Sequence, residues 1–442
     1  MKRLLIATAV LAVLGGFIFW SNKLEEAKKD EPNPKAPKIL TLKEEDIRGI
    51  EVQRKDEPPT LLKRDDVGKW TIASPLAVAA DMQVVSAITA GASNLNADHV
   101  VDEKATGLAS YGLDPATVSL TLTTKDGKPH RLRLGDETPD KSGVYAVIDG
   151  DPRLFAIATF ARETYNKSAM DLREKRLMTF TPDKVSHVEL NVSGKPPIEF
   201  GRQDDQWQIT KPRPMRADKL TVEELVRVAH EAQIDPTMDE KQSTAAFTSA
   251  KPLATVRLTA DTGIQNFELR QAGSDYFGRS SSVTGAFKVA ATVGDGLNKK
   301  LEDFQNKKLF DFGFDDPSKV EIKIKDDTKV FEKNVGKSAA LWLSNGRTMD
   351  SVAVQNLIDK LRELSASRID DVAPATAEIL ITVTSNNGKR VETVQIAPSG
   401  PDFLAKREKE PQFYRIDGSA ITALKEALAS VREAAPEPPA KK

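Results

Sequence analysis

The stretch Trp70-Thr71-Ile72-Ala73-Ser74-Pro75 decides how this chain is interpreted, because a variant of it returns as Trp207-Gln208-Ile209-Thr210-Lys211-Pro212. In both copies an Ala-Asp pair follows, with its Asp eleven residues after the Trp. A third tryptophan, Trp342, lies 135 residues after Trp207, which itself lies 137 residues after Trp70. This spacing predicts three copies of one module of roughly 130 residues, near the usual size of a domain.

The residues around each tryptophan also repeat. A strand-like triplet with a central Glu precedes each Trp. An Asp after each Trp opens a segment with apolar residues near helical spacing, and Asp is a favoured N-cap. An alternating run then surrounds a polar turn suited to a hairpin, and a strand-like patch and a short helical segment close the copy. The triplets are 50–52, 188–190 and 320–322, the turns are 126–127, 262–263 and 387–388, and the closing patches are 154–157, 286–289 and 413–416.

We therefore expect an α+β fold, with an N-terminal transmembrane helix followed by three tandem repeats of a mixed strand and helix module with antiparallel hairpins. The period far exceeds the 20–50 residues of solenoid repeats, so tandem domains are favoured over a stacked array. The alternative is that copies share sheets across their boundaries. The expected divisions are 1–20 for the anchor, 21–38 for a charged, proline-containing linker, 39–175, 176–307 and 308–432 for the three modules, and 433–442 for a disordered tail.

Residues 4–20 carry no charge and would span about 26 Å as a helix, at the short end for a transmembrane segment. Lys2 and Arg3 precede them, which predicts a single-pass protein of the bacterial inner membrane with a cytoplasmic N-terminus and most of the chain in the periplasm. A cleavable signal peptide with a weak site after Gly15 is the alternative. The apolar run continues to Trp20, which favours an uncleaved anchor.

Composition narrows the classes of partner and chemistry. The chain has 64 basic and 65 acidic residues, a net charge of -1, and shows no basic stripe interleaved with aromatic residues. Nucleic acid is therefore not an expected partner. The absence of cysteine excludes disulfides and thiol chemistry, and it is compatible with a periplasmic domain that folds without bridges.

We predict no catalytic, cofactor-binding or metal-binding residues. Ile234 stands where a zinc-protease motif beginning at His230-Glu231 needs its second His, and Phe331 stands where a phosphate loop ending at 336–338 needs a Gly. The acidic doublets suit turns better than acid-base or calcium sites. The other histidines are His99, His130 and His187, and the doublets are 65–66, 204–205, 315–316, 326–327 and 370–371.

The tryptophans could stack on a ligand, but core packing is the favoured interpretation. In a Trp-x-Ile strand both side chains share one face, which we expect to pack under the adjacent helix. The segment Tyr111-Gly112-Leu113-Asp114-Pro115 is interpreted as backbone punctuation. Gly112 can end a helix in the left-handed conformation, Leu113 can return to the core, and Pro115 sets the entry into the next strand.

These motifs together resemble the DUF4340 family of bacterial proteins, whose function is unknown. The resemblance is carried by the start of the chain, by the Trp70 segment with Ala80-Asp81, by Tyr111 to Pro115, and by Leu134-Gly135-Asp136 with Val144 to Val147. It is strongest over residues 60–300, and the third copy departs from it at Gly346. It supplies no catalytic residues. It implies an accessory role alongside ABC-type transport systems of the gliding-motility kind.

Our leading hypothesis is a non-enzymatic, membrane-anchored envelope protein that serves as a periplasmic scaffold or accessory subunit for membrane transport components of the ABC type. Two alternatives are an envelope hydrolase that uses carboxylates of one module, and a module that binds lipid or glycan. No cofactor is expected. An unchanged function after Asp114 and Asp136 are both replaced by Asn would count against a carboxylate enzyme built there.

Overall fold

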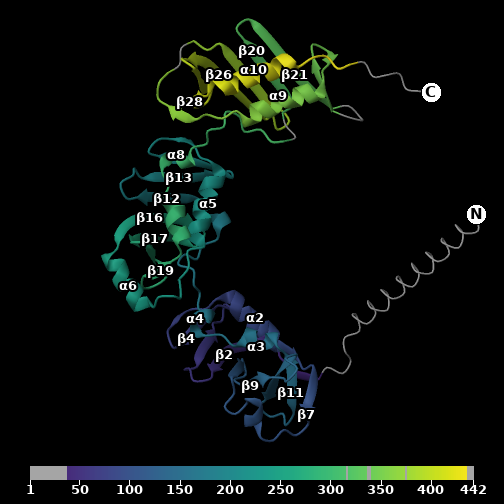
Figure 1. Cartoon of the computed structure of the whole chain (residues 1–442), viewed down its shortest axis with the longest axis vertical. Coiled ribbons are helices and arrows are strands. Elements are labelled where there is room, and N and C mark those ends of the chain that lie inside the picture. Colours follow the sequence, from purple (N-terminus) through teal and green to yellow (C-terminus); the bar gives the residue numbers. More distant parts are fainter. Residues whose placement is uncertain (1–36, 315–316, 336–339, 374–375, 436–442) are drawn as a thin grey trace, which may run out of the picture. The chain divides into compact units, whose positions relative to one another are not determined.

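The computed structural model describes residues 37–314, 317–335, 340–373 and 376–435. It divides into two compact units, residues 1–175 and 176–442, and each is described by itself. Unit 1 contains one large antiparallel sheet and unit 2 contains two (Figure 1). The expected anchor at residues 1–20 lies outside the described residues. Within the described ranges no helix combines the length and apolarity that crossing a membrane requires.

The sheet of unit 1 has nine strands in the order β5-β4-β3-β2-β8-β9-β10-β11-β7, and a small sheet pairs β1 with β6. Two meanders therefore meet at the central pair of β2 and β8, where Ile50 lies opposite Leu122. The strands are β1 (Lys38–Thr41), β2 (Ile47–Arg54), β3 (Thr60–Arg64), β4 (Trp70–Ser74), β5 (Val78–Ala79), β6 (Asn94–Asn96), β7 (His99–Asp102), β8 (Val118–Thr124), β9 (Pro129–Glu137), β10 (Gly143–Ile148) and β11 (Leu154–Ala158).

The second sheet follows the same plan in the order β15-β14-β13-β12-β16-β17-β18-β19, and its central pair places Val188 opposite Leu258. Its first edge ends in a two-residue strand, as in unit 1. The strands are β12 (His187–Val192), β13 (Ile198–Gln203), β14 (Gln206–Lys211), β15 (Met215–Arg216), β16 (Lys251–Ala260), β17 (Gly263–Ala272), β18 (Asp275–Ser280) and β19 (Phe287–Val289).

The third sheet has the order β23-β22-β21-β20-β25-β26-β27-β28-β24, with Val320 opposite Val383 in the central pair. All three sheets thus share the order of eight strands, and the first and third add a ninth strand, β7 and β24, at the last edge. The strands are β20 (Lys319–Ile324), β21 (Asp327–Val335), β22 (Ala340–Ser344), β23 (Arg347–Thr348), β24 (Arg368–Asp370), β25 (Ile379–Ser385), β26 (Arg390–Ser399), β27 (Asp402–Arg407) and β28 (Phe413–Ile416).

A pair of helices covers one face of each sheet, while in the second sheet residues 240–249 form a further helix on the opposite face, where Phe247 packs on Phe277. The first helix of each pair begins after an Asp that accepts backbone hydrogen bonds from the first turn: Asp81 before α2, Asp218 before α5 and Asp350 before α9. The helices are α2 (Met82–Ser93), α3 (Phe160–Tyr165), α4 (Ala169–Leu172), α5 (Lys219–His230), α6 (Glu240–Ser249), α7 (Ala291–Leu297), α8 (Leu301–Phe304), α9 (Ser351–Glu363) and α10 (Gly418–Ser430), with 3-10 turns η1 (Glu44–Asp46), η2 (Leu108–Tyr111) and η3 (Pro182–Lys184).

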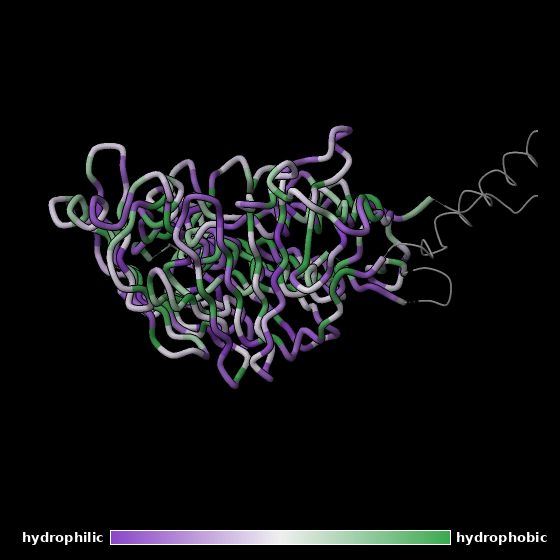
Figure 2. Tube along the Cα trace, turned by 90° about the horizontal axis from the view of Figure 1, so that it is seen from below, coloured by the Kyte–Doolittle hydropathy of each residue, from purple (hydrophilic) through white to green (hydrophobic). Residues whose placement is uncertain are grey.

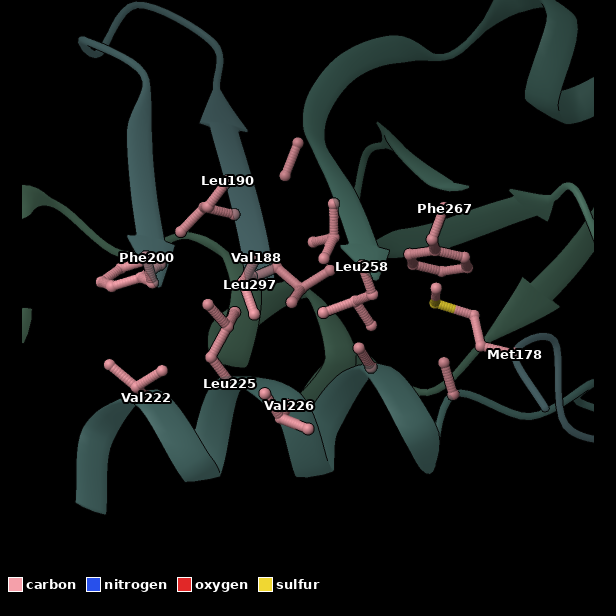
Figure 3. Packing of buried hydrophobic residues seen from close by; sticks show 14 of the residues in the cluster. Met178, Val188, Leu190, Phe200, Val222, Leu225, Val226, Leu258, Phe267 and Leu297 are labelled. Carbon is pink, nitrogen blue, oxygen red and sulfur yellow. The ribbon is translucent and has the colours of Figure 1, made fainter. Parts of the chain in front are cut away.

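The main core of each sheet lies between the sheet and this helical layer. In the second sheet, Val222, Leu225 and Val226 of α5 point at apolar side chains of the strands, among them Phe200 and Leu258 (Figure 3). The strands alternate buried and exposed residues, as in the burial of Val188, Leu190 and Val192 along β12. Figure 2 shows this alternation as short hydrophobic and hydrophilic stretches along the tube. Burial of one face per strand is the expected pattern for antiparallel sheets with a solvated side.

Equivalent backbone hydrogen bonds connect the helix start of each copy to its last residues. The Asp that caps the first helix donates its N–H to the carbonyl of a residue near the end of its copy, with Asp81 bonded to Leu172, Asp218 to Phe304 and Asp350 to Arg432. Each leading segment bonds just after the first helix of its own copy, as from Leu177 to Ala232 and from Leu309 to Leu364. The predicted module boundaries themselves remain a prediction.

The expected α+β class is wrong for the structure described, whereas the expected transmembrane helix falls on residues outside it. Antiparallel sheets dominate, with 43% of residues in strands against 23% in helices. The reason is that α2, α5, α9 and α10, the longest helices described, have only 12 or 13 residues, whereas each large sheet takes eight or nine strands. The helical spacing in the sequence correctly predicted helices. These helices, however, form only a thin layer over extended sheets.

Candidate functional site: the open faces of the sheets

The face of each sheet opposite to its main pair of helices, here called the open face, carries polar side chains of the strands. In the second sheet α6 covers part of this face, where Arg270 and Arg279 lie over the Phe247 ring. A glutamate stands at the centre of the open face in all three copies: Glu51, Glu189 and Glu321 each lie between two buried residues of the central strand. Because side chains alternate along a strand, each carboxylate projects from the open face, where all three are partly exposed.

In the second sheet, the open face forms a hollow of about 380 Å³ across β12, β16, β17 and β18. Its charged groups pair across strands: Arg257 Nη1 lies 3.6 Å from Glu189 Oε1, and Arg279 Nη2 lies 2.6 Å from Glu268 Oε2. Burial of Glu268 disfavours its charged form, but hydrogen bonds from Arg270 and Arg279 outweigh this effect and lower its pKa. A carboxylate held ionised in this way is poorly matched to general acid-base catalysis near neutral pH.

In the first sheet, the corresponding face forms a hollow of about 560 Å³ across β2, β8 and β9. Arg133 Nη2 lies 3.3 Å from Asp149 Oδ1, and Arg54 Nη1 lies 3.0 Å from Glu57 Oε2. The two hollows occupy equivalent positions of the repeated topology, because the strand pair of β2 and β8 corresponds to the pair of β12 and β16. The charged residues lining this hollow are Arg54, Lys55, Asp56, Asp114, Arg131, Arg133 and Asp149.

The segment from Tyr111 to Pro115 forms one wall of that hollow. Gly112 has a φ of 67° and ends η2, and Leu113 is only 1% exposed, as the sequence predicted. Asp114 and Pro115 are joined by a cis peptide bond. The segment packs tightly on Leu134-Gly135-Asp136, since a Cβ on Gly135 would lie 2.0 Å from the Tyr111 carbonyl oxygen. Residues 111–115 and 134–136 therefore pack directly against each other.

The two carboxylates near this contact lie at the surface. The Asp136 carboxylate packs against Gly112, where a Cβ would lie 2.5 Å from its carboxyl carbon, and both Asp114 and Asp136 are exposed. Tyr111 packs edge-to-face on Tyr145 with ring centroids 5.0 Å apart, which fixes the segment over the sheet. The contact explains the motif through packing.

The histidines weighed in the sequence lie apart, with His99 on β7, His130 on β9, His187 on β12 and His230 at the end of α5. His187 lies 3.5 Å from Glu189, and His230 packs edge-to-face on Phe180. In the part of the chain that the structure describes, no three His, Asp or Glu side chains gather as metal ligands.

Several acidic doublets occupy turns, as predicted. Asp65 accepts backbone hydrogen bonds from Val67 and Lys69 in the turn before β4, and Asp204 and Asp205 both have positive φ between β13 and β14. Residues 370–371 differ, because Asp370 belongs to β24 and pairs with Arg415. Residues 315–316 and the Gly-Lys-Ser segment at 336–338 lie outside the described residues.

All three repeated tryptophans are buried, with 4%, 2% and 5% exposure for Trp70, Trp207 and Trp342. They belong to the cores under the helical layers, and none of them lines either of the two hollows described above. The core interpretation is confirmed. An arginine on the neighbouring strand flanks the first two, with Arg64 and Arg202 about 6 Å from the ring centres.

A larger groove of about 740 Å³ lies between α5 and α7 on the helical side of the second sheet. Val228 and Val293 contribute its apolar part, and Glu224, Arg227 and Lys299 contribute charges. A Cβ on Gly296 would lie 2.7 Å from Val228, so the helices touch at this point. The groove is therefore a seam between two packed helices, with charged groups along it.

Sequence reasoning missed one feature of the described residues, a largely buried group of arginines and carboxylates around Arg216 in unit 2. Arg216 contacts Asp311 and Glu410, which lie 95 and 194 residues further along the chain. No local spacing marks residues so far apart. The only signal was that Arg216 is charged, whereas the equivalent residue of the two-residue strand in unit 1 is Ala79.

Comparison with known proteins bears on identity but adds no chemistry. No curated protein and no solved structure matched the chain. The model of a domain of unknown function, DUF4340, matches residues 70–208 and again residues 207–382. The two matches begin at Trp70 and Trp207, so they follow the tryptophan repeat, and together they cover more than half of the chain. This chain therefore belongs to the DUF4340 family.

Proposed function

We propose that this protein is a non-enzymatic accessory scaffold of the bacterial cell envelope that binds membrane transport components of the ABC type through the open faces of its sheets. The observation that carries the proposal is the repetition of one polar face, centred on Glu51, Glu189 and Glu321, in three sheets that share the order of eight strands. Repetition of a face is expected for a protein that presents surfaces to partners. A single catalytic site would need only one copy.

The chemistry of the faces supports binding over catalysis. Small-molecule sites are mostly apolar and concave, with a few converging polar groups. The hollow of the second sheet is instead lined mostly by polar and charged residues, and its carboxylates pair with arginines across the strands. Partly exposed polar surfaces of this kind are typical of the rims and wet regions of protein-protein interfaces.

The transport partner and the envelope location rest on sequence expectations. The partner class follows from the family resemblance, and the inner-membrane location follows from the charge and hydropathy of residues 2–20. The alternatives of a carboxylate hydrolase and of a lipid- or glycan-binding module remain predictions. No contact among the described residues around Asp114 and Asp136 favours the hydrolase.

Site-specific photo-crosslinking on the full-length protein tests the proposal. A photoreactive residue replaces Thr255, which lines the hollow of the second sheet, and a matched one replaces Leu220, which is 77% exposed at the start of α5 on the helical side. Both proteins are irradiated in the producing cells and purified in mild detergent, and the crosslinked species are identified by mass spectrometry.

The expected result is a crosslink from position 255 to a subunit of a membrane transport system, with none from position 220. A protein recovered without crosslinks from position 255, and from the equivalent Ser119 in the first sheet, would refute binding through the open faces. A crosslink from position 220 alone would assign the binding surface to the helical layer and overturn this proposal.

A further inference from the structure

We propose that the largely buried ionic cluster around Arg216 is a latch that fixes the second and third sheets of unit 2 as one rigid body. The cluster joins β15, which belongs to the second sheet, to the segment and strands of the third sheet that carry Asp311, Arg407 and Glu410. This role is separate from the proposed binding function, because it concerns how the two faces are held and not what they bind.

Arg216 makes the central contacts of the latch. Its side chain is only 13% exposed, and its Nη1 donates to Asp311 Oδ2 at 2.6 Å while its Nη2 donates to the Lys308 carbonyl at 2.5 Å. Its Nε lies 2.7 Å from Glu410 Oε1, although not in hydrogen-bonding alignment. Burial disfavours the charge of Arg216, but Asp311 and Glu410 outweigh this effect and raise its pKa.

The carboxylates that receive Arg216 are themselves held from the third sheet. Arg407 Nε donates to Glu410 Oε1 at 2.7 Å, and its Nη2 donates to Glu392 Oε1 at 2.9 Å. Glu392 also accepts the backbone N–H of Asp311, and the buried Tyr414 hydroxyl donates to Glu410. Contacts within the third sheet thus hold Glu410 and the backbone of Asp311 in place, and the two carboxylates suit the forked guanidinium of Arg216.

Two further contacts flank the latch and differ in kind. Gln412, 6% exposed, donates to the Pro214 carbonyl at 2.5 Å and therefore adds a neutral tie. Arg213 pairs with Asp371, but both side chains are exposed, at 43% and 76%. Exposed pairs contribute little, whereas removal of one partner from a buried pair leaves an uncompensated charge. The geometry therefore assigns the fixation to Arg216 and makes Arg213 a matched control.

The complete absence of cysteine allows a direct test on the full-length chain. Cysteines replace the exposed Asn191 on β12 and Lys323 on β20, both receive nitroxide labels, and pulsed electron resonance measures the distance distribution between them. The unsubstituted latch is expected to give one narrow distribution. Arg216→Ala is expected to broaden it at least about twofold, whereas Arg213→Ala leaves it narrow.

Circular dichroism checks that the sheets stay folded in each variant. If Arg216→Ala unfolds unit 2, the double variant Arg216→Met with Glu410→Gln takes its place, because it removes one charge of each sign and so leaves less uncompensated charge than the single variant. A broadened distribution in this folded double variant supports the latch. A narrow distribution in a folded variant without Arg216, or a broad distribution with Arg216 present, would overturn it.

Discussion

Replacement of Trp207 by Ala and by Phe tests the energetics of the repeated core. Trp207 is 2% exposed, and a buried tryptophan removes roughly 150–250 Å² from water, which corresponds to about 4–6 kcal/mol at about 25 cal/mol per Å² as an upper bound. Its indole N–H is buried and finds no acceptor among the described residues, at a cost of about 1–3 kcal/mol that the native sheet already carries. Subtracting this cost predicts a loss of about 3 kcal/mol for Trp207→Ala.

Trp207→Phe keeps most of the apolar area and removes the unsatisfied N–H, so we expect a loss below about 1.5 kcal/mol. Hydrogen exchange of the β13 and β14 amides in the full-length chain measures both values, with the β3 and β4 amides of unit 1 as the internal reference. The Ala variant should exchange about a hundredfold faster in the second sheet. Equal losses for Ala and Phe, or exchange within about threefold of the native rate for Ala, would refute the reasoning.

Three further predictions concern single residues. Gly135→Ala should destabilise unit 1 by about 1–3 kcal/mol, because its Cβ would collide with the Tyr111 carbonyl. Gly201→Ala is the control, since its Cβ meets only an ordinary contact at 3.5 Å. Urea unfolding of the two variants measures the difference in stability. Asp218→Ala removes the cap of α5 and should cost about 1 kcal/mol, and Asp218→Asn should be nearly neutral in the same assay, so equal losses would argue against capping. Burial raises the pKa of Tyr165 to about 12, so unfolding releases its proton near pH 10 while the folded protein holds it, and stability should fall between pH 10 and 12 by up to about 2.7 kcal/mol. Urea midpoints at pH 9 and pH 11 measure this loss, which should shrink in Tyr165→Phe; an unchanged slope in that variant would exclude Tyr165 as its source.

Local features of the fold were predictable because each depends on neighbours in the sequence. Asp81 caps a helix through its own first turn, Gly127 takes a φ of 80° in a two-strand turn, and Trp70 shares a face with Ile72. These outcomes follow from backbone geometry and the two-residue period of a strand. The close packing of Gly112 and Gly135 is only partly of this kind, since both glycines were visible but not their contact.

The arrangement of the strands was less accessible, because it depends on pairings between distant segments. Nothing near β2 indicates that its second neighbour is β8, and the sequence accordingly suggested a mixed α+β module where long antiparallel sheets form. The candidate site was hidden for the same reason. Glu51 reads as an ordinary polar residue of a strand, and it becomes the centre of a face only when β8 and β9 lie beside it.

The Arg216 cluster illustrates why contacts between buried charged residues are difficult to predict from a sequence. Asp311 follows one apolar stretch, Glu410 lies in a polar turn, and neither position indicates a partner. A buried carboxylate needs a partner, but the sequence does not reveal burial for a charged residue. Such sites become visible only through the packing of segments that a local pattern does not connect.

The central strand pair has a consequence for how this protein can be divided into fragments. The two matches to the family model begin at Trp70 and Trp207, each in the outer part of a sheet, so a fragment cut at Trp70 would lose β2 and β3. β8 would then keep β9 on one side and present an unpaired edge on the other, which favours association with other chains. The unit that is repeated in the sequence and the unit that folds are therefore offset, and a foldable first fragment must begin before Lys38 and continue through Arg173, the residue that bridges Ala80.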